Sequence, residues 1–509
     1  MAAILLMATA AQTQITMPKL LPTGLDISLG RPISLIQNNQ KIIIKNQSDN
    51  ANFANTIDGD TESKWCPSSQ AKSYYLKIDL GQDRRLTGTA ITWASNATNF
   101  KANFEILRDN QWLVLHSDSK NSLNWATQKQ PLNASARYVR FSVIGTKTLP
   151  CIRAIRVFAL ALAPNNNFII GHDLSTVIQL EDIGKTFSEQ GITQPIEKIL
   201  VNHQSNLVRL RLWVNPLENF NNLAQVKRMA IRVKAAGMKF LLDFHYSDTW
   251  ADPGHQDIPK DWAGQDLSSL TKSVREYSQA VIAELVAQNT APDMVQIGNE
   301  ITNGMLYPLG KIEGSSQAGF QNFAQLLQAG IQGTRAGMPA GHAYEIMIHI
   351  DRGANAFVTQ SFFERLEQAQ ISFDVIGLSY YPYWNGSLSS LRTSLDGLAK
   401  RFKKPIIITE TAYPWTLKDF DNYPNIIGAG TTLPDAYSPS IEGQALFLRD
   451  LLSVIAQIPN NLGRGMIYWE SAWLSGIPWK PQEGNAWDNQ TLFSATGEAL
   501  ESLQAFHLR

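Results

Sequence analysis

Eight apolar runs, each short enough to be a β-strand, recur from residue 168 to the end of the chain and alternate with amphipathic helical patterns. The runs are 168–175, 207–215, 239–248, 294–300, 343–351, 374–382, 405–413 and 463–473. One helical pattern between them lasts from Leu223 to Val233 and ends at Gly237. Eight strand–helix units in roughly 340 residues predict an α/β fold, a (β/α)₈ TIM barrel. A doubly wound open sheet is the alternative, but the sequence lacks its glycine-rich phosphate fingerprint.

The region before these units carries β-strand patterns instead. Alternating runs such as 75–80 and 137–143 recur between turns, and no helical stretch interrupts them. We therefore expect an all-β jelly-roll sandwich over residues 24–162, a polar linker at 163–167, and the barrel over residues 168–509. A chain of 509 residues exceeds a single core of ordinary size, which fits two domains.

The first residues and the two cysteines indicate whether the protein is exported from the cytoplasm. The apolar run Ala2–Ala11 ends in small residues, as secretory signal peptides do, although no positively charged segment precedes it. We predict a signal-peptide remnant and leader at 1–23 and a secreted or periplasmic protein; a frayed terminus is the alternative. Cys66 and Cys151 are the two cysteines. They form either one disulfide, as an exported chain permits, or two free buried thiols.

The charge balance limits the partners. Lys and Arg number 44, Asp and Glu also number 44, and no basic block stands out. We therefore expect no binding to nucleic acid and none to an anionic membrane. No apolar run reaches the roughly 18 residues of a membrane-spanning helix. The 13 Trp and 14 Tyr residues suit either surfaces that stack on sugar rings or a packed core. We expect the protein to be a monomer.

Polar side chains crowd the carboxyl ends of the predicted strands, where barrels carry their chemistry. Glu300 closes the fourth strand and Glu410 the seventh, each after an apolar run. Two carboxylates that face each other across a cleft can divide the work: one donates a proton and the other, ionised, attacks. Alternation places Arg209 and Arg211 on one face of the second strand, with Arg211 nearer its end. We expect Arg211 to lie beside Glu410 and keep it ionised. The alternative is that both glutamates only cap or pair.

Seven motifs between residues 168 and 509 resemble the endo-β-1,4-galactanases of glycoside hydrolase family 53. They are GHDLS (171–175), VRLRLWVNP (208–216), LLDFHYSDTWADPG (241–254), VQIGNEITNGML (295–306), DVIGLSYYPYW (374–384), TETAYP (409–414) and YWESAW (468–473). The resemblance implies a retaining endo-hydrolase of β-1,4-galactan in pectic, type I arabinogalactan, with no cofactor needed for the chemistry. The alternatives are a related hydrolase of another β-linked polysaccharide and a non-catalytic carbohydrate-binding protein.

The same resemblance assigns roles to individual residues. Glu300 is expected to be the general acid/base, Glu410 the nucleophile, and Asn299 a ligand of the sugar 2-hydroxyl. The other residues expected in the substrate site would orient the carboxylates, form the floor of the cleft or select the substrate. They are Arg211, His245, His349, Tyr381, Trp469, Trp250 and Trp384. Tyr380 competes with Tyr381 for one of these roles.

A structural calcium ion is a further expectation from the resemblance, since some family members hold one in the loops after strands 7 and 8. Asp419, Asp421 and Asn422 offer hard oxygen ligands of the right kind there. The alternative is a solvated acidic loop.

The N-terminal region resembles galactose-binding-like, or discoidin, sandwich modules. The matching stretches are IDGD (57–60), KW (64–65), IDLG (78–81), ARYVR (136–140) and 152–158. Many such modules bind sugars through loops at one end, so the sandwich is either a glycan-binding module or a structural spacer.

Overall fold

The computed structural model describes most of the barrel and the strands of the sandwich. The described residues are 25–26, 33–37, 40–41, 66, 73–93, 101–118, 127–144, 151–159, 167–218, 220–312, 317–434, 437–480 and 483–507. The predicted leader at 1–23 and nearly all of the predicted linker lie outside them. Within the described residues, no helix has both the length and the apolar character needed to cross a membrane.

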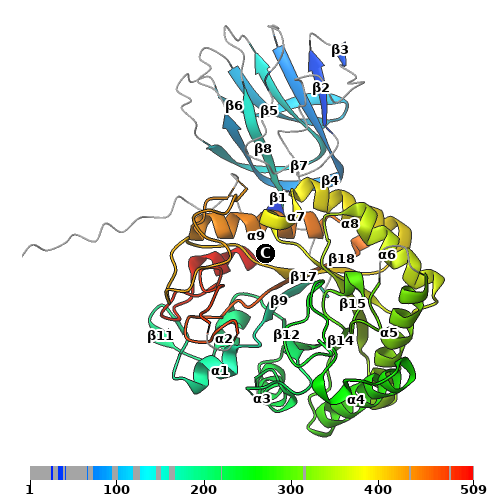
Figure 1. The fold of residues 1–509 in the computed structure, drawn as a ribbon. Coiled ribbons are helices and arrows are strands. Elements are labelled where there is room, and N and C mark those ends of the chain that lie inside the picture. The colour runs from blue at the N-terminus through cyan, green and yellow to red at the C-terminus, as the bar shows by residue number, and fades with distance from the viewer. Residues whose placement is uncertain are drawn as a thin grey trace, which may run out of the picture.

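The predicted barrel is confirmed, because eight parallel strands close on themselves in chain order (Figure 1). They are β9 (Ile169–Asp173), β12 (Leu207–Leu212), β13 (Lys239–Phe244), β14 (Met294–Ile297), β15 (Glu345–Ile350), β16 (Val375–Ser379), β17 (Ile406–Thr411) and β18 (Gly463–Tyr468). The helices of this region are α1 (Val177–Asp182), α2 (Ile196–Asn202), α3 (Leu223–Ala235), α4 (Leu267–Ala287), α5 (Gln317–Gly337), α6 (Ala356–Gln368), α7 (Pro382–Asn385), α8 (Leu388–Phe402) and α9 (Ile441–Ala456).

The barrel interior is built in layers, because side chains two residues apart on a strand point to the same side. The lowest layer takes one apolar residue from each strand: Ile169, Leu207, Leu241, Met294, Met347, Val375, Ile407 and Ile467. Two residues further along, five strands contribute buried polar side chains instead: Arg209, Asp243, Gln296, His349 and Thr409. The barrel is therefore sealed with apolar groups below and carries charged and hydrogen-bonding groups toward the carboxyl ends of its strands.

The predicted all-β domain is confirmed as an antiparallel sandwich with its own apolar core. Its strands are β1 (Leu25–Asp26), β2 (Ile33–Gln37), β3 (Gln40–Lys41), β4 (Ser73–Trp93), β5 (Lys101–Arg108), β6 (Gln111–Asp118), β7 (Thr127–Ile144) and β8 (Ile152–Ala159). Of the two alternatives for the cysteines, the structure contains the disulfide, which joins Cys66 to Cys151.

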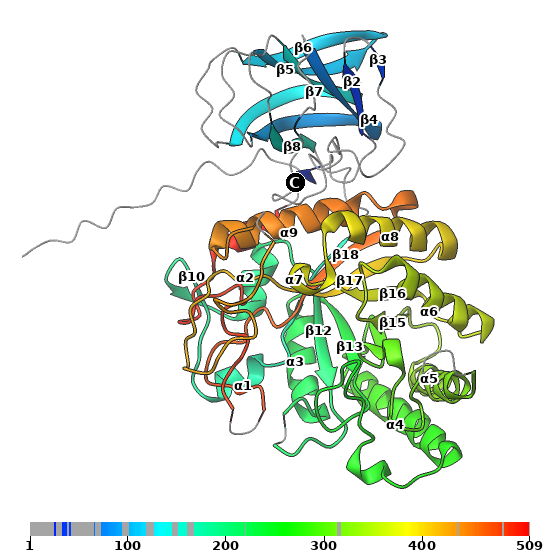
Figure 2. The ribbon, with the colours of Figure 1, turned by 45° about the horizontal axis from the view of Figure 1, so that its top comes forward.

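A buried ion pair joins the two domains. Figure 2 shows the sandwich against the side of the barrel that α8 and α9 cover. Nη1 of Arg156, on β8, lies 2.7 Å from both carboxylate oxygens of Asp450 on α9. The Tyr437 hydroxyl donates to the same carboxylate at 2.9 Å. Both charged side chains are almost fully buried, so the sandwich is held to the barrel by a specific contact that excludes water.

Candidate active site

One cleft of about 990 Å³ opens at the carboxyl ends of the barrel strands. Eight of the ten residues predicted for catalysis and substrate binding line it: His245, Trp250, Asn299, Glu300, Tyr381, Trp384, Glu410 and Trp469. The other two, Arg211 and His349, do not border this cleft. The structure therefore brings together strand ends that are far apart in the sequence, as a closed barrel requires.

A β-bulge sets the position of Glu410. On the neighbouring strand β16, Leu378 pairs with Ile408 but the next residue, Ser379, pairs with Glu410, so β17 carries one extra residue here. Bulges of this kind re-aim side chains and are common beside active sites. Both Thr409 and Glu410 are buried as a result, with Glu410 only 5% exposed and bordering the cleft.

Glu410 has a cation and a hydroxyl as partners. Nη1 of Arg209 lies 2.9 Å from Oε1 of Glu410, and the Tyr381 hydroxyl donates to Oε2 at 3.2 Å. Burial raises the pKa of Glu410 to about 7, an effect that Arg209 and the Tyr381 hydrogen bond oppose and that the charges of Asp243 and Asp173 reinforce. Glu410 therefore carries a negative charge once the pH exceeds this value, and its charge is stabilised by two specific groups.

The prediction that Arg211 accompanies Glu410 was wrong, because Arg209 occupies that place. The Arg209 guanidinium lies in the polar layer below the cleft and also binds Asp173 at 3.0 Å and Asp243 at 2.7 Å. Arg211, two residues nearer the strand end, pairs instead with Glu470, the second residue after β18. The Trp250 ring covers the Arg211 guanidinium at 4.2 Å. Although Arg209 lies one layer further from the strand ends than Arg211, its long side chain extends toward the cleft and reaches the Glu410 carboxylate.

Glu300 sits in an unusual backbone conformation just past the end of β14. Its φ is +47°, in the left-handed region that non-glycine residues seldom adopt, and Gly298 two residues earlier has φ +79°. Such conformations recur where a side chain must be held in a fixed direction at a functional site. Here the backbone turns sharply into η3 (Ile301–Asn303), and the Glu300 side chain borders the cleft.

The partners of Glu300 differ from those of Glu410. Among the described residues no cation lies within ion-pair distance of Glu300, and its carboxylate accepts a hydrogen bond from the Ser379 hydroxyl at 2.5 Å. Burial raises the pKa of Glu300 well above its usual value, and the negative charges of Glu410 and Asp351 raise it further. This carboxyl group is therefore suited to hold a proton while Glu410 is ionised.

His349 is fully buried and reaches the site through Ser379 and through Asn299, whose Oδ1 lies 3.1 Å from its Nδ1. Its Nε2 lies 2.9 Å from the Ser379 hydroxyl oxygen, and its Nδ1 lies 3.1 Å from Nε2 of Gln296. Burial and the nearby Arg209 hold the pKa of His349 well below its usual value, so the ring is neutral. Because Ser379 donates its one hydrogen to Glu300, the ring nitrogen Nε2 must be the donor to Ser379. His349 therefore does not border the cleft, and of the roles expected for it, orienting a carboxylate is the one that fits, through Ser379 to Glu300.

Asn299 and His245 are held by the same polar layer. Oδ1 of Asn299 accepts from Arg209 at 2.7 Å, and its Nδ2 donates to the Ala251 carbonyl at 2.8 Å. Nε2 of His245 lies 3.1 Å from Asp243. Both side chains border the cleft in a fixed orientation. Of the two competing tyrosines, Tyr381 contacts Glu410, whereas the Tyr380 hydroxyl donates to the Gly386 carbonyl away from the cleft.

Tryptophan rings form the walls of the cleft. Trp250 and Trp479 stack at 5.0 Å between ring centroids with 15° between planes, and Trp469 meets Trp487 edge-on at 4.7 Å. Trp384 is 54% exposed at the rim. Trp469 and Trp487 are buried, whereas Trp250, Trp479 and Trp384 expose part of their ring surface, and exposed rings can present apolar faces to sugar rings. Trp479 and Trp487 also line the cleft and were not predicted as site residues, although two tryptophans in the loop after the eighth strand were a usable signal.

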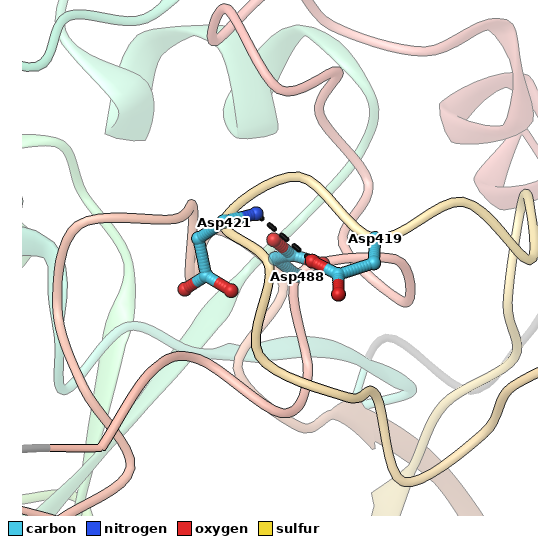
Figure 3. A group of neighbouring side chains, drawn as sticks. All are labelled: Asp419, Asp421 and Asp488. Atoms are coloured by element: carbon cyan, nitrogen blue, oxygen red, sulfur yellow. Dashed lines mark hydrogen bonds between the residues drawn. The ribbon is translucent and has the colours of Figure 1, made fainter.

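An acidic cluster lies between the loops that follow β17 and β18. Asp419, Asp421 and Asp488 bring one carboxylate oxygen each within 4.8 Å of one another (Figure 3). The expected third residue, Asn422, is exposed and contributes only its backbone N–H, which donates to Asp419 at 2.9 Å. Burial raises the pKa of Asp488 to about 6, and the charges of the two other aspartates act in the same direction.

Known proteins match both domains. Residues 169–506 match the model of Glycosyl hydrolase family 53, and residues 40–155 match the F5/8 type C domain. The arabinogalactan endo-β-1,4-galactanase of Cellvibrio japonicus is 36% identical over 363 residues, covering 69% of this chain and 93% of that protein. The endo-β-1,4-galactanase of Bacillus subtilis is 31% identical over 383 residues, covering 67% and 86%. The solved GH53 catalytic domain of Ignisphaera aggregans is 36% identical with a TM-score of 0.64, covering 68% and 98%.

Proposed function

The chain belongs to glycosyl hydrolase family 53, and from this premise we propose that it cleaves β-1,4-galactan within the chains of pectic, type I arabinogalactan. The relatives named above are galactanases. The observation that carries the proposal is the pair of glutamates in one cleft, one bound by Arg209 and the other without a cation among its described neighbours. No cofactor enters this chemistry.

The mechanism proposed is double displacement with retention of configuration. The Glu410 carboxylate attacks the anomeric carbon and forms an ester while the glycosidic C–O bond breaks. Glu300 gives its proton to the departing oxygen. Glu300, now ionised, takes a proton from water, and that water attacks the anomeric carbon, releases the sugar and restores the Glu410 carboxylate.

The neighbours of the two glutamates support this division of roles. Arg209 and Tyr381 stabilise the charge on Glu410 before the attack. Ser379 orients Glu300 and stabilises it in the ionised state that follows proton transfer. Asn299, already fixed by Arg209 and Ala251, is the side chain that we assign to the sugar 2-hydroxyl.

A substrate panel tests the proposal. The protein is incubated with pectic galactan, arabinan, xylan and mannan, and the products are separated by size. We expect galactan alone to be cut into short oligosaccharides of mixed length early in the reaction. Preferred cleavage of another polysaccharide would instead support the alternative of a related hydrolase, and no cleavage of any would support a binding protein. Proton NMR of the first products on galactan should show the β-anomer at the new reducing end.

The acidic cluster fits a calcium ion. Oδ2 of Asp488 and Oδ1 of Asn425 are buried without a hydrogen-bond partner among the described residues. Together with Asp419 and Asp421 they form a set of hard oxygen donors, which calcium prefers. These residues would hold the ion, which would neutralise the clustered charges and tie the loop after β17 to the loop after β18, which carries Trp479 and Trp487.

The compartment, the sandwich and the oligomeric state complete the proposal. A disulfide between Cys66 and Cys151 supports an oxidising location outside the cytoplasm. We further propose that the enzyme acts as a monomer. We assign the sandwich to retention on insoluble galactan, and equal retention of the full chain and of residues 167–509 would make it a spacer instead.

A further inference from the structure

Arg211 does not border the cleft, but it contacts a side chain that does. Its guanidinium carbon lies 4.2 Å from the centroid of the Trp250 ring, and Trp250 lines the cleft. A cation over the face of an aromatic ring is attracted to it, and the attraction is stronger where water is excluded. Arg211 is only 2% exposed, so this contact is shielded from solvent. The catalytic steps proposed above use neither side chain.

Glu470 fixes the position of the Arg211 guanidinium. Nη1 of Arg211 forms an ion pair with Oε1 of Glu470, and the Thr176 hydroxyl donates to Oε2 at 2.6 Å. Glu470 is fully buried, and its φ of +46° lies in the left-handed region. Non-glycine residues seldom adopt this conformation, which recurs where a side chain must point in a fixed direction. Both carboxylate oxygens are therefore engaged, and the guanidinium is held in one place.

Trp250 belongs to the loop after β13, and its other contacts include a second loop. Its indole N–H donates to the backbone carbonyl of Trp479 at 2.9 Å, and the two rings are nearly parallel. Trp479 lies in the loop after β18, and loops are more mobile than the strands that they connect. Arg211, by contrast, lies on β12. The guanidinium therefore connects the Trp250 ring directly to a barrel strand.

We infer that Arg211, held by Glu470, is a positioning residue that sets the plane of the Trp250 ring against which a sugar unit of the galactan chain packs. The inference rests on the proposed function. An aromatic ring offers its apolar face to a sugar only in one orientation. A ring that tilts away loses this contact in the bound substrate and in the transition state alike. Loss of binding common to both states raises KM and leaves kcat nearly unchanged.

The test uses two variants of the ion pair and a soluble linear galactohexaose as substrate. The double variant Arg211→Met/Glu470→Gln removes both charges, so that neither is left buried without its partner. Glu470→Gln alone keeps the shape of the side chain but removes the charge that holds Arg211. The matched control is Arg365→Met on α6, because the Arg365 guanidinium lies 4.0 Å from the Phe320 ring but does not line the cleft.

The expected result is a separation of KM from kcat. KM of the double variant should rise by roughly 3- to 10-fold, which corresponds to the loss of one desolvated cation–aromatic contact. Its kcat should stay within about twofold of the native value. Glu470→Gln should show a smaller rise of KM in the same direction, and Arg365→Met should match the native enzyme in both constants.

A double-mutant cycle shows whether the ion pair acts through the ring. The two charge-removing substitutions are repeated in Trp250→Ala, and kcat/KM is compared within each background. If Arg211 acts by orienting Trp250, its removal should cost nothing further once the ring is gone. Independent effects would instead multiply.

Each outcome decides the inference. A rise of KM at nearly native kcat, absent from Arg365→Met and from the Trp250→Ala background, supports it. A fall in kcat overturns it, because the pair would then act on the reacting groups. An equal fall in kcat/KM with and without the Trp250 ring also overturns it. A native KM in the double variant, or in Glu470→Gln if the double variant does not fold, shows that the pair only stabilises the barrel. A native enzyme that cleaves no galactan overturns the proposed function and this inference together.

Discussion

Ser379 offers a direct way to change the proton affinity of Glu300. Its hydroxyl donates to Glu300 at 2.5 Å, and this bond favours the ionised carboxylate. Ser379→Ala removes the bond, so the pKa of Glu300 should rise further. Hydrogen bonds to charged groups contribute about 1.5–3 kcal/mol, and one pKa unit corresponds to about 1.4 kcal/mol. We therefore expect an upward shift of about 1–2 units.

The assay is kcat/KM as a function of pH on a soluble galacto-oligosaccharide. Glu300 must be protonated to act as the acid, so activity falls as the pH rises through its pKa. In Ser379→Ala this alkaline limb should move to higher pH. The acid limb comes from Glu410, which Ser379 does not contact through a side-chain hydrogen bond, and should move much less.

Ser390→Ala is the control, since Ser390 also lines the cleft but its hydroxyl pairs with Ser387. The alkaline limb of the pH profile of Ser390→Ala should coincide with that of the native enzyme. An alkaline limb that stays in place or moves to lower pH in Ser379→Ala would refute the reasoning, because Ser379 would then not stabilise ionised Glu300.

Three further predictions concern the nucleophile, the domain contact and the acidic cluster. Because the pKa of Glu410 is about 7, kcat/KM of the native enzyme should fall below about pH 7 with a slope of one proton; a profile that is flat to pH 5 would contradict this. Arg156→Met should lower the free energy of unfolding by about 3–5 kcal/mol in denaturant titrations, since a buried charge loses its partner; adding Asp450→Asn should recover most of the loss, and additive losses would count against the ion pair. Calcium should raise Tm after chelator treatment, and Asp488→Ala should abolish that rise; an equal rise in both proteins would exclude the cluster as the site.

The fold was predictable because the barrel depends on periodicity, which the sequence displays. Each barrel strand is an apolar run, and alternation within it determines which residues enter the interior layers. Glu300 and Glu410 were found for the same reason, since each ends an apolar strand. The resemblance of the motifs added the division of roles.

The features that the sequence did not predict have a common physical cause. How far a side chain extends, where a strand is distorted and which loops touch do not follow the periodic hydrophobic pattern. Arg209 and Arg211 share a face, and the choice between them depended on Glu470, which draws Arg211 away. The bulge in β17 that turns Glu410 inward leaves no trace in the hydrophobic pattern. Asp488 joins the acidic cluster through contact between two loops, which sequence spacing cannot reveal.

Azide rescue tests the central assignment of Glu410 as nucleophile and Glu300 as acid/base most directly. Each glutamate is replaced by alanine, and turnover of an aryl β-galactobioside with a good leaving group is measured with and without azide, with the anomer of the product read by NMR. In Glu300→Ala, azide should restore turnover and give the β-galactosyl azide, because Glu410 still forms the ester and azide replaces the activated water. In Glu410→Ala, any azide product should be the α-anomer, because azide then attacks directly from the side that Glu410 occupied. A β-azide from Glu410→Ala together with an α-azide from Glu300→Ala would contradict the assignment and exchange the roles of the two glutamates.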